Sequence, residues 1–165
     1  YFSAGTSDGS EGTYSGQSGN VSIYNVTAAG TETLATWAIR TEHTEAGSKQ
    51  VVRLADGVGR IEADGAATVK WTGSFSENFY GGLVPFTITD PVLTIAADGS
   101  GELTGTIVGC KASMGGGPCE ALAPAAVTIA EFAGVHANPE EALTVTPAYA
   151  GVEVDTTGAS TAQKR

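Results

Sequence analysis

Residues 71–109 read WTGSFSENFYGGLVPFTITDPVLTIAADGSGELTGTIVG, and this stretch decides the fold. Apolar and polar residues alternate along it, which is the pattern of strands with one buried face. The alternation begins in a predicted strand over Ala67–Phe75, one face of which carries Val69, Trp71, Gly73 and Phe75. We expect Asp90-Pro91 to break the chain, because proline lacks an N–H and disfavours helix in the residue before it. The pattern predicts antiparallel strands.

The second half of this stretch predicts a hairpin. Leu93 and Ile95 share one strand face, and the sequence ADGSG at 97–101 is typical of a turn. Leu103 and Ile107 would then lie on the returning strand.

The rest of the chain predicts further short strands and almost no helix. The strands are expected at Val21 with Ile23, Leu34–Ile39, Val51–Leu54, Val127 with Ile129, Leu143 with Val145, and Val152 with Val154. Helical turns are expected only within Thr41–Gln50 and Asn138–Ala142. We therefore predict an all-β fold, an antiparallel β-sandwich or flattened barrel with at most one or two short helical turns. Its predicted core is Trp37, Ile39, Val69, Trp71, Phe75, Leu93, Ile95, Leu103, Ile107, Val127 and Ile129.

The two ends of the chain differ in composition from its middle. Residues 1–19 are rich in Gly, Ser and Thr and nearly devoid of aliphatic side chains, which predicts a tail or a strand that needs a partner. As a donor strand, this segment would add to the sheet edge of a neighbouring copy and link copies head to tail in a filament. Residues 20–154 form the predicted β domain, and 155–165 a polar tail.

Composition limits the function classes. The chain has 165 residues, 16% of them charged, 23 glycines and a net charge of −10. Its eight Lys and Arg residues are scattered, which argues against nucleic-acid binding. No apolar run approaches the roughly 20 residues of a membrane span, so we expect no membrane insertion within this segment. This profile favours a secreted or cell-surface β protein, and the start at Tyr1 fits either a removed signal peptide or a chain that simply begins there.

Cys110 and Cys119 flank the glycine-rich sequence KASMGGGP. A disulfide between them would remove loop entropy worth roughly 2–3 kcal/mol and would indicate an oxidising compartment. The rival reading is metal binding, but two thiolates without a nearby histidine make only half a zinc site. We expect the disulfide and no metal.

Enzyme motifs are weak. Ser7 stands in GTSDG, which matches the nucleophile pattern Gly-x-Ser-x-Gly. Such a serine must lie between a strand and a helix, and the sequence predicts neither beside Ser7. Asp56, Glu62 and Asp64 offer oxygen ligands for calcium, although their glycines are out of register and acids in loops are usually just solvated. We predict that the protein is not an enzyme.

Several local patterns together resemble the HtaA-like family, which comprises secreted and surface-anchored actinobacterial domains associated with haem uptake. The resemblance spans roughly Asn20 to Val154. It is carried by Trp71-Thr72-Gly73-Ser74, Gly81-Gly82-Leu83, Thr89-Asp90-Pro91 and Gly101-Glu102-Leu103, and by Trp37-Ala38-Ile39-Arg40, which is similar to the Trp-Gly-Val-Lys-type opening of the domain.

The resemblance implies where haem ligands would lie. Haem-binding members use a tyrosine after the opening and a histidine in a Gly-His-x-Gly loop, which suits ferric iron because the histidine can hydrogen-bond the phenolate. Here those positions fall near Ala46 and on Tyr80, so the pair is not kept. Tyr80 itself or His43 are the candidate haem ligands. The alternative is that Phe79 and Tyr80 are loop aromatics over a sheet edge and His43 faces solvent.

The sequence leaves three hypotheses for the function of the protein. The first is a non-enzymatic surface module with a structural, adhesive or self-assembling role, needing no cofactor. The second is haem binding and uptake, which the family resemblance implies. The third, a secreted hydrolase, has only the Ser7 motif in its favour.

Overall fold

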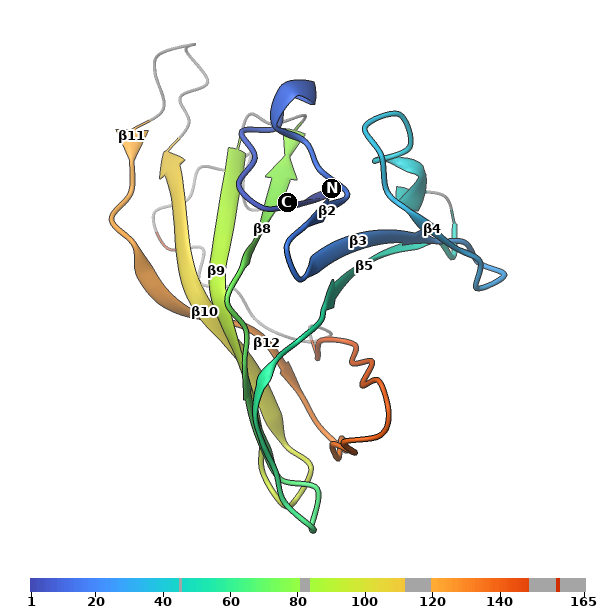
Figure 1. The fold of residues 1–165 in the computed structure, drawn as a ribbon. Coiled ribbons are helices and arrows are strands. Elements are labelled where there is room, and N and C mark those ends of the chain that lie inside the picture. The colour runs from blue at the N-terminus through green and yellow to red at the C-terminus, as the bar shows by residue number, and fades with distance from the viewer. Residues whose placement is uncertain (45, 81–83, 112–119, 149–156, 158–165) are drawn as a thin grey trace.

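The computed structural model describes residues 1–44, 46–80, 84–111, 120–148 and 157. It confirms the predicted fold class, because the described chain consists of antiparallel strands with two short 3-10 turns, η1 (Glu11–Thr13) and η2 (Glu42–Thr44). The strands form two sheets, which diverge from each other in Figure 1.

The larger sheet has eight strands. Its long central strands are β8 (Ser74–Phe79), β9 (Val84–Ile95) and β10 (Gly101–Lys111). The others are β1 (Phe2–Ala4), β6 (Val58–Ile61), β7 (Ala67–Lys70), β11 (Glu120–Ala121) and β12 (Ala125–Phe132). β1 pairs with β8 and β6 with β7 on one side of β9, whereas β11 and β12 both pair with β10 on the other side. The sheet therefore has β1 and β6 along one edge and β11 and β12 along the opposite edge.

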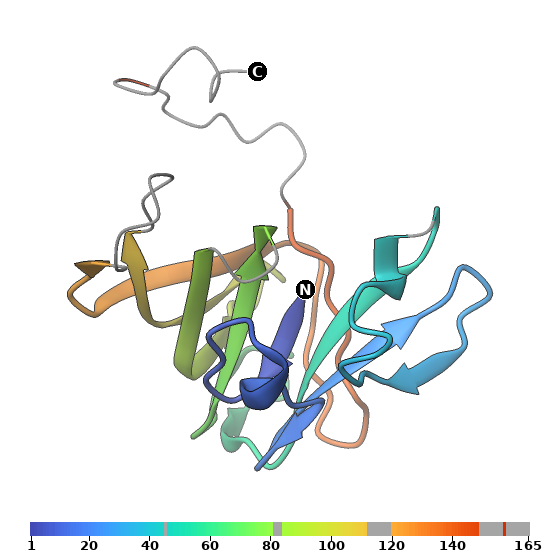
Figure 2. The same ribbon diagram turned by 90° about the horizontal axis from the view of Figure 1, so that it is seen from above.

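The smaller sheet has four strands centred on β3 (Val21–Val26). β3 pairs with β5 along its whole length and with β2 and β4 on its other side. These partners are β2 (Gln17–Ser18), β4 (Glu32–Leu34) and β5 (Lys49–Leu54). Figure 2 shows the N-terminal strand between the two sheets.

The predicted hairpin is confirmed. Leu93 lies opposite Leu103, and the turn closes through a hydrogen bond from Ala96 N to Ser100 O at 2.8 Å. The predicted break at Asp90-Pro91 is wrong, because β9 continues through both residues. The register shifts there, and Asp90 has a φ of 49°. A bulge accommodates the proline, since a bulged residue need not donate to the ladder.

The predicted strand Ala67–Phe75 is divided into β7 and β8. Trp71 N still donates to Pro91 O at 3.0 Å, but Gly73, with a φ of 154°, turns the chain before β8 begins. Trp71 therefore packs half-buried against the cluster around Leu93, while Phe75 packs in a different cluster. The prediction that one continuous strand face carries both side chains is wrong.

Two apolar clusters stabilise the fold. The first joins the two sheets and consists of Ala4, Val21, Ile23, Ala35, Phe75 and Ile88, with Ile107, Val127 and Ile129 half-buried around it. The second lies at the β9–β10 hairpin and consists of Ala67, Leu93, Ile95 and Phe132, with Val69, Trp71 and Leu103 around it. The predicted core is thus confirmed at Phe75, Leu93 and Ile95, and its other members are only half-buried.

Two predicted strands and one helical turn are wrong. β4 ends at Leu34, and a turn follows in which Ile39 N donates to Thr36 O at 3.2 Å. Leu143 and Val145 lie in irregular chain, although Val145 packs against the second cluster. Asn138–Glu141 forms a turn rather than a helix. The predicted strand at 152–154 lies outside the described residues, as does the tail 155–165 apart from residue 157.

The N-terminal segment is part of the fold of its own chain. β1 pairs with β8, placing Ser3 opposite Ser76. On its other side, Ala4 N donates to Ser15 O at 2.7 Å and Phe2 N donates to Gln50 Oε1 at 2.6 Å. The strand that we expected to need a partner therefore finds it within the same chain, and the segment is neither a tail nor a free donor strand in this structure.

Candidate functional site

Tyr80, the first candidate haem ligand, directly follows β8. Its side chain is 86% exposed and its φ is 49°, a left-handed conformation that is rare for a bulky residue. Phe79 beside it is 42% exposed and contacts Phe86 edge-on, with ring centroids 6.0 Å apart. The end of β8 thus presents aromatic side chains to solvent.

His43, the second candidate, lies in η2, which contacts β3 and β5 of the smaller sheet. Its Nδ1 is 3.0 Å from Arg40 O, and burial lowers the pKa of the half-buried imidazole. No contact among the described residues joins His43 to Tyr80, so the structure does not bring the two candidates into one site.

Arg40, which the sequence analysis did not single out, lies in the turn between β4 and η2. Its guanidinium carbon is 3.5 Å from the ring centroid of Trp37 and 5.3 Å from that of Tyr1. Its Nη1 donates to Trp37 O at 2.7 Å. Tyr14 closes the group, because its ring lies 5.9 Å from Tyr1 and 5.8 Å from Trp37. We call Tyr1, Tyr14 and Trp37 the aromatic cage of Arg40.

Two polar atoms inside this group have no hydrogen-bond partner among the described residues. They are Arg40 Nε and the Tyr14 hydroxyl, both shielded from solvent. Burial raises the pKa of Tyr14 to about 12, so its phenol stays protonated and keeps a proton to donate. Buried polar atoms are almost always paired in proteins, and unpaired ones mark a place that needs explanation.

Ser7, the residue of the nucleophile pattern, is buried beneath the N-terminal loop. Its Oγ lies 3.2 Å from Thr13 Oγ1 and accepts a hydrogen bond from Gly9 N at 3.1 Å. Its backbone N–H donates to Ser76 Oγ at 2.9 Å. The serine thus stabilises a turn, and the described contacts join it to neither histidine.

The three acids considered for calcium do not converge. Asp56 lies before β6, whereas Glu62 and Asp64 lie after it, in the turn to β7. Glu62 pairs with Arg60 at 2.5 Å, and Asp64 Oδ1 accepts from Ala66 N at 3.1 Å. Within the described part of the chain, no three His, Cys, Asp or Glu side chains gather in a way that would hold a metal ion.

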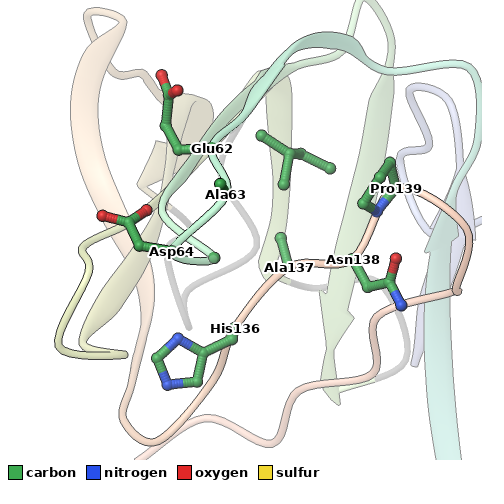
Figure 3. Close-up of a pocket in the computed structure, with 9 residues that line it drawn as sticks. Glu62, Ala63, Asp64, His136, Ala137, Asn138 and Pro139 are labelled. Atoms are coloured by element: carbon green, nitrogen blue, oxygen red, sulfur yellow. The ribbon is translucent and has the colours of Figure 1, made fainter.

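A groove of about 450 Å³ lies between this turn and the segment after β12 (Figure 3). Ala137 N donates to Gly65 O at 3.1 Å across it. The carboxylates of Glu62 and Asp64 and the ring of His136 point in different directions in Figure 3. The groove therefore offers space without a converging set of polar groups.

Cys110 lies near the end of β10, opposite Ala121 of β11. The same ladder sets Lys111 opposite Glu120, so the two ends of the glycine-rich loop are neighbours. Cys119 lies outside the described residues, and the disulfide stays a prediction.

Comparisons with known proteins add no family. No protein-family model matches the sequence, and neither a curated protein nor a solved structure matches it significantly. None of the helices in the described residues has the length and apolarity to span a membrane.

Proposed function

We propose that this chain is a non-enzymatic, secreted or cell-surface β module that self-assembles by strand addition at β12. One observation carries the proposal: at Ala125–Thr128 the outer edge of β12 carries no charged side chain and has no strand partner among the described residues. The HtaA-like resemblance, the composition and the predicted disulfide support the extracellular location.

The open edge is the side of β12 that faces away from β10. β10 pairs with one side along the strand. On the other side, the described chain supplies one hydrogen bond, from Ala148 N to Glu131 O at 2.8 Å. A bulge at Ile129 interrupts the pairing with β10, so the regular part of the open edge is Ala125–Thr128. Its backbone groups are available to another strand.

Three other edge strands carry charges of the kind that normally prevent such pairing. β5 carries Lys49 and Arg53, β6 carries Arg60, and β4 carries Glu32. Charged side chains on edges are a common protection against edge-to-edge association. β12 has no charged residue between Ala125 and Ala130, so it lacks this protection.

A second copy of the chain fits this edge. Antiparallel pairing about a two-fold axis, centred between Ala126 and Val127, would set Ala125 of one copy opposite Thr128 of the other. No like charges meet in that ladder, and two copies would share one continuous sheet. The net charge of −10 on each copy opposes the encounter at long range, so we expect added salt to strengthen assembly.

The test is sedimentation equilibrium over a range of protein concentrations at low and moderate salt. We expect the wild type to associate and Thr128→Lys to remain monomeric. Thr68→Lys is the matched control, because Thr68 is also an exposed strand threonine but β7 is paired on both sides. Association that Thr128→Lys leaves unchanged, or a wild type that is monomeric throughout, would refute the proposal.

Haem binding is the second candidate function, and the observation that favours it is the exposed phenol of Tyr80 on left-handed backbone. Strained residues cluster at functional sites. Titration with ferric haem should then give a saturable Soret band at one haem per chain, which Tyr80→Phe abolishes. A band that survives both Tyr80→Phe and His43→Ala would exclude these ligands.

A further inference from the structure

We infer that the aromatic cage holds Arg40 as a receptor for the carboxylate of a partner molecule. This inference is independent of the proposed assembly at β12, because it concerns a different surface and a different kind of ligand.

The first step is that the guanidinium is fixed in place. Trp37 stacks against it at 3.5 Å, Tyr1 lies 5.3 Å away, and Nη1 is tied to Trp37 O. Stacking on aromatic rings and a bond to backbone remove most of the rotamer freedom of an arginine. A cation fixed in advance loses little entropy when an anion arrives.

The second step is that this cation has no anion beside it among the described residues. Arg53 pairs with Glu32 at 2.7 Å and Arg60 pairs with Glu62, but no carboxylate of the described residues lies within 4.0 Å of Arg40. A partly buried charge is normally paired, and this chain has 18 acidic residues from which a partner could have come. The described part of the chain thus leaves a half-buried arginine without a carboxylate partner in an acidic protein.

The third step is the choice of ligand. A guanidinium fork matches the two oxygens of a carboxylate. The rings of Tyr1 and Trp37 would contact the apolar body that carries the carboxylate.

The test uses sodium acetate as the probe, titrated into the full chain at constant ionic strength with chloride as the balancing anion. The readout is the NMR signal of Arg40 Nε–H together with the indole N–H of Trp37. We expect a saturable shift of both signals with acetate. A linear shift, or the same shift with chloride, would overturn the inference.

Matched variants locate the effect. Arg40→Lys keeps the charge but loses the fork and should weaken acetate binding about tenfold or more, the size expected for one charge-assisted hydrogen bond. Arg53→Lys, on an exposed and paired arginine, should leave it unchanged. Dispersed amide spectra for both variants would establish that they fold.

Two further experiments test whether the anion is a carboxylate and whether it comes from a partner molecule. Inorganic phosphate should bind more weakly than acetate, and equal or tighter binding would overturn the carboxylate assignment. Glu45 is the acid that follows most closely after η2 and lies outside the described residues. We expect Glu45→Gln to bind acetate as the wild type does. Acetate binding seen only in Glu45→Gln would mean that Glu45 supplies the carboxylate in the wild type. That result would overturn the inference that a partner molecule supplies it.

Discussion

The two edges of the eight-stranded sheet have opposite surroundings. At one edge, β1 is enclosed, because Ser15 and Gln50 accept the hydrogen bonds of Ala4 N and Phe2 N that β8 leaves free. At the other edge, β12 leaves Ala125–Thr128 uncovered by any described residue. The strand from the polar, glycine-rich segment is covered on both sides, and the apolar strand is open on one side. Whether each of these two edges is covered thus depends on what the chain places beside the strand, and not on how apolar the strand is.

The difference changes where self-association is expected. The sequence placed a donor strand in residues 1–19, because that segment has few apolar side chains of its own. In the structure Ser3 and Ser76 are fully buried in the β1–β8 pair, so the segment is already used. An assembly surface is therefore expected at β12 and not at β1.

The largest expected effect comes from disturbing the cover of β1 at Gly16. A Cβ there would lie 1.9 Å from Ala35 O, a backbone atom, so the chain must shift. We expect Gly16→Ala to lower the free energy of unfolding by about 3 kcal/mol or more, measured by urea denaturation. Gly12→Ala is the matched control, because nothing lies within 4 Å of its added Cβ. Equal stability of the two variants would mean that the enclosure of β1 is wrong.

A smaller effect is expected from the polar layer that ties the N-terminal loop to β8. Ser76 Oγ donates to Gly5 O at 2.8 Å and accepts from Ser7 N at 2.9 Å. Ser76→Ala should lower the free energy of unfolding by about 1–3 kcal/mol, because both backbone groups lose a partner. Thr94→Ala, on an exposed residue of β9, should change it by less than about 0.5 kcal/mol. A neutral Ser76→Ala would show that the loop is not anchored there.

The smallest effect is expected at Asp8, which is fully exposed. Hydrogen bonds from Ser10 and from the Thr13 hydroxyl lower the pKa of Asp8 to about 2. Since this value lies below that of the unfolded chain, the stabilisation is complete above about pH 4 and is lost as the pH falls toward 2. Asp8→Asn should therefore lower the urea midpoint at pH 7 and match the wild type near pH 2. A difference that is the same at both pH values would exclude this titration as its cause.

The sequence predicted well where apolar alternation and turn residues coincide. The β9–β10 hairpin is the example, since Leu93, Leu103 and the turn at 97–101 all carry the expected signal. It failed at β1, because this three-residue strand buries a serine and has no period to detect. Gly5 and Gly9 were the signal that the sequence offered, because glycine favours tight turns. Both have a positive φ in the structure.

The candidate site shows the same limit. The run Trp37-Ala38-Ile39-Arg40 has the composition of a strand, but it forms a turn that brings Arg40 back over Trp37. Its partners Tyr1 and Tyr14 come from a segment that was predicted to be a tail or a strand in need of a partner. Contacts between residues far apart in the sequence, each in irregular chain, leave no local pattern. The motifs of Ser7 and of the three acids are local patterns that have no matching site in the structure. A motif alone carries no information about what its side chains contact.

Hydrogen exchange at the two edges tests the central claim most directly. Amide exchange would be measured at protein concentrations below and above the onset of assembly. The account predicts that the amides of Phe2 and Ala4 are protected at every concentration, whereas the β12 amides that β10 leaves free become protected only when copies associate. Protection of both edges in the dilute monomer, or β12 amides that stay unprotected in the assembled protein, would contradict it.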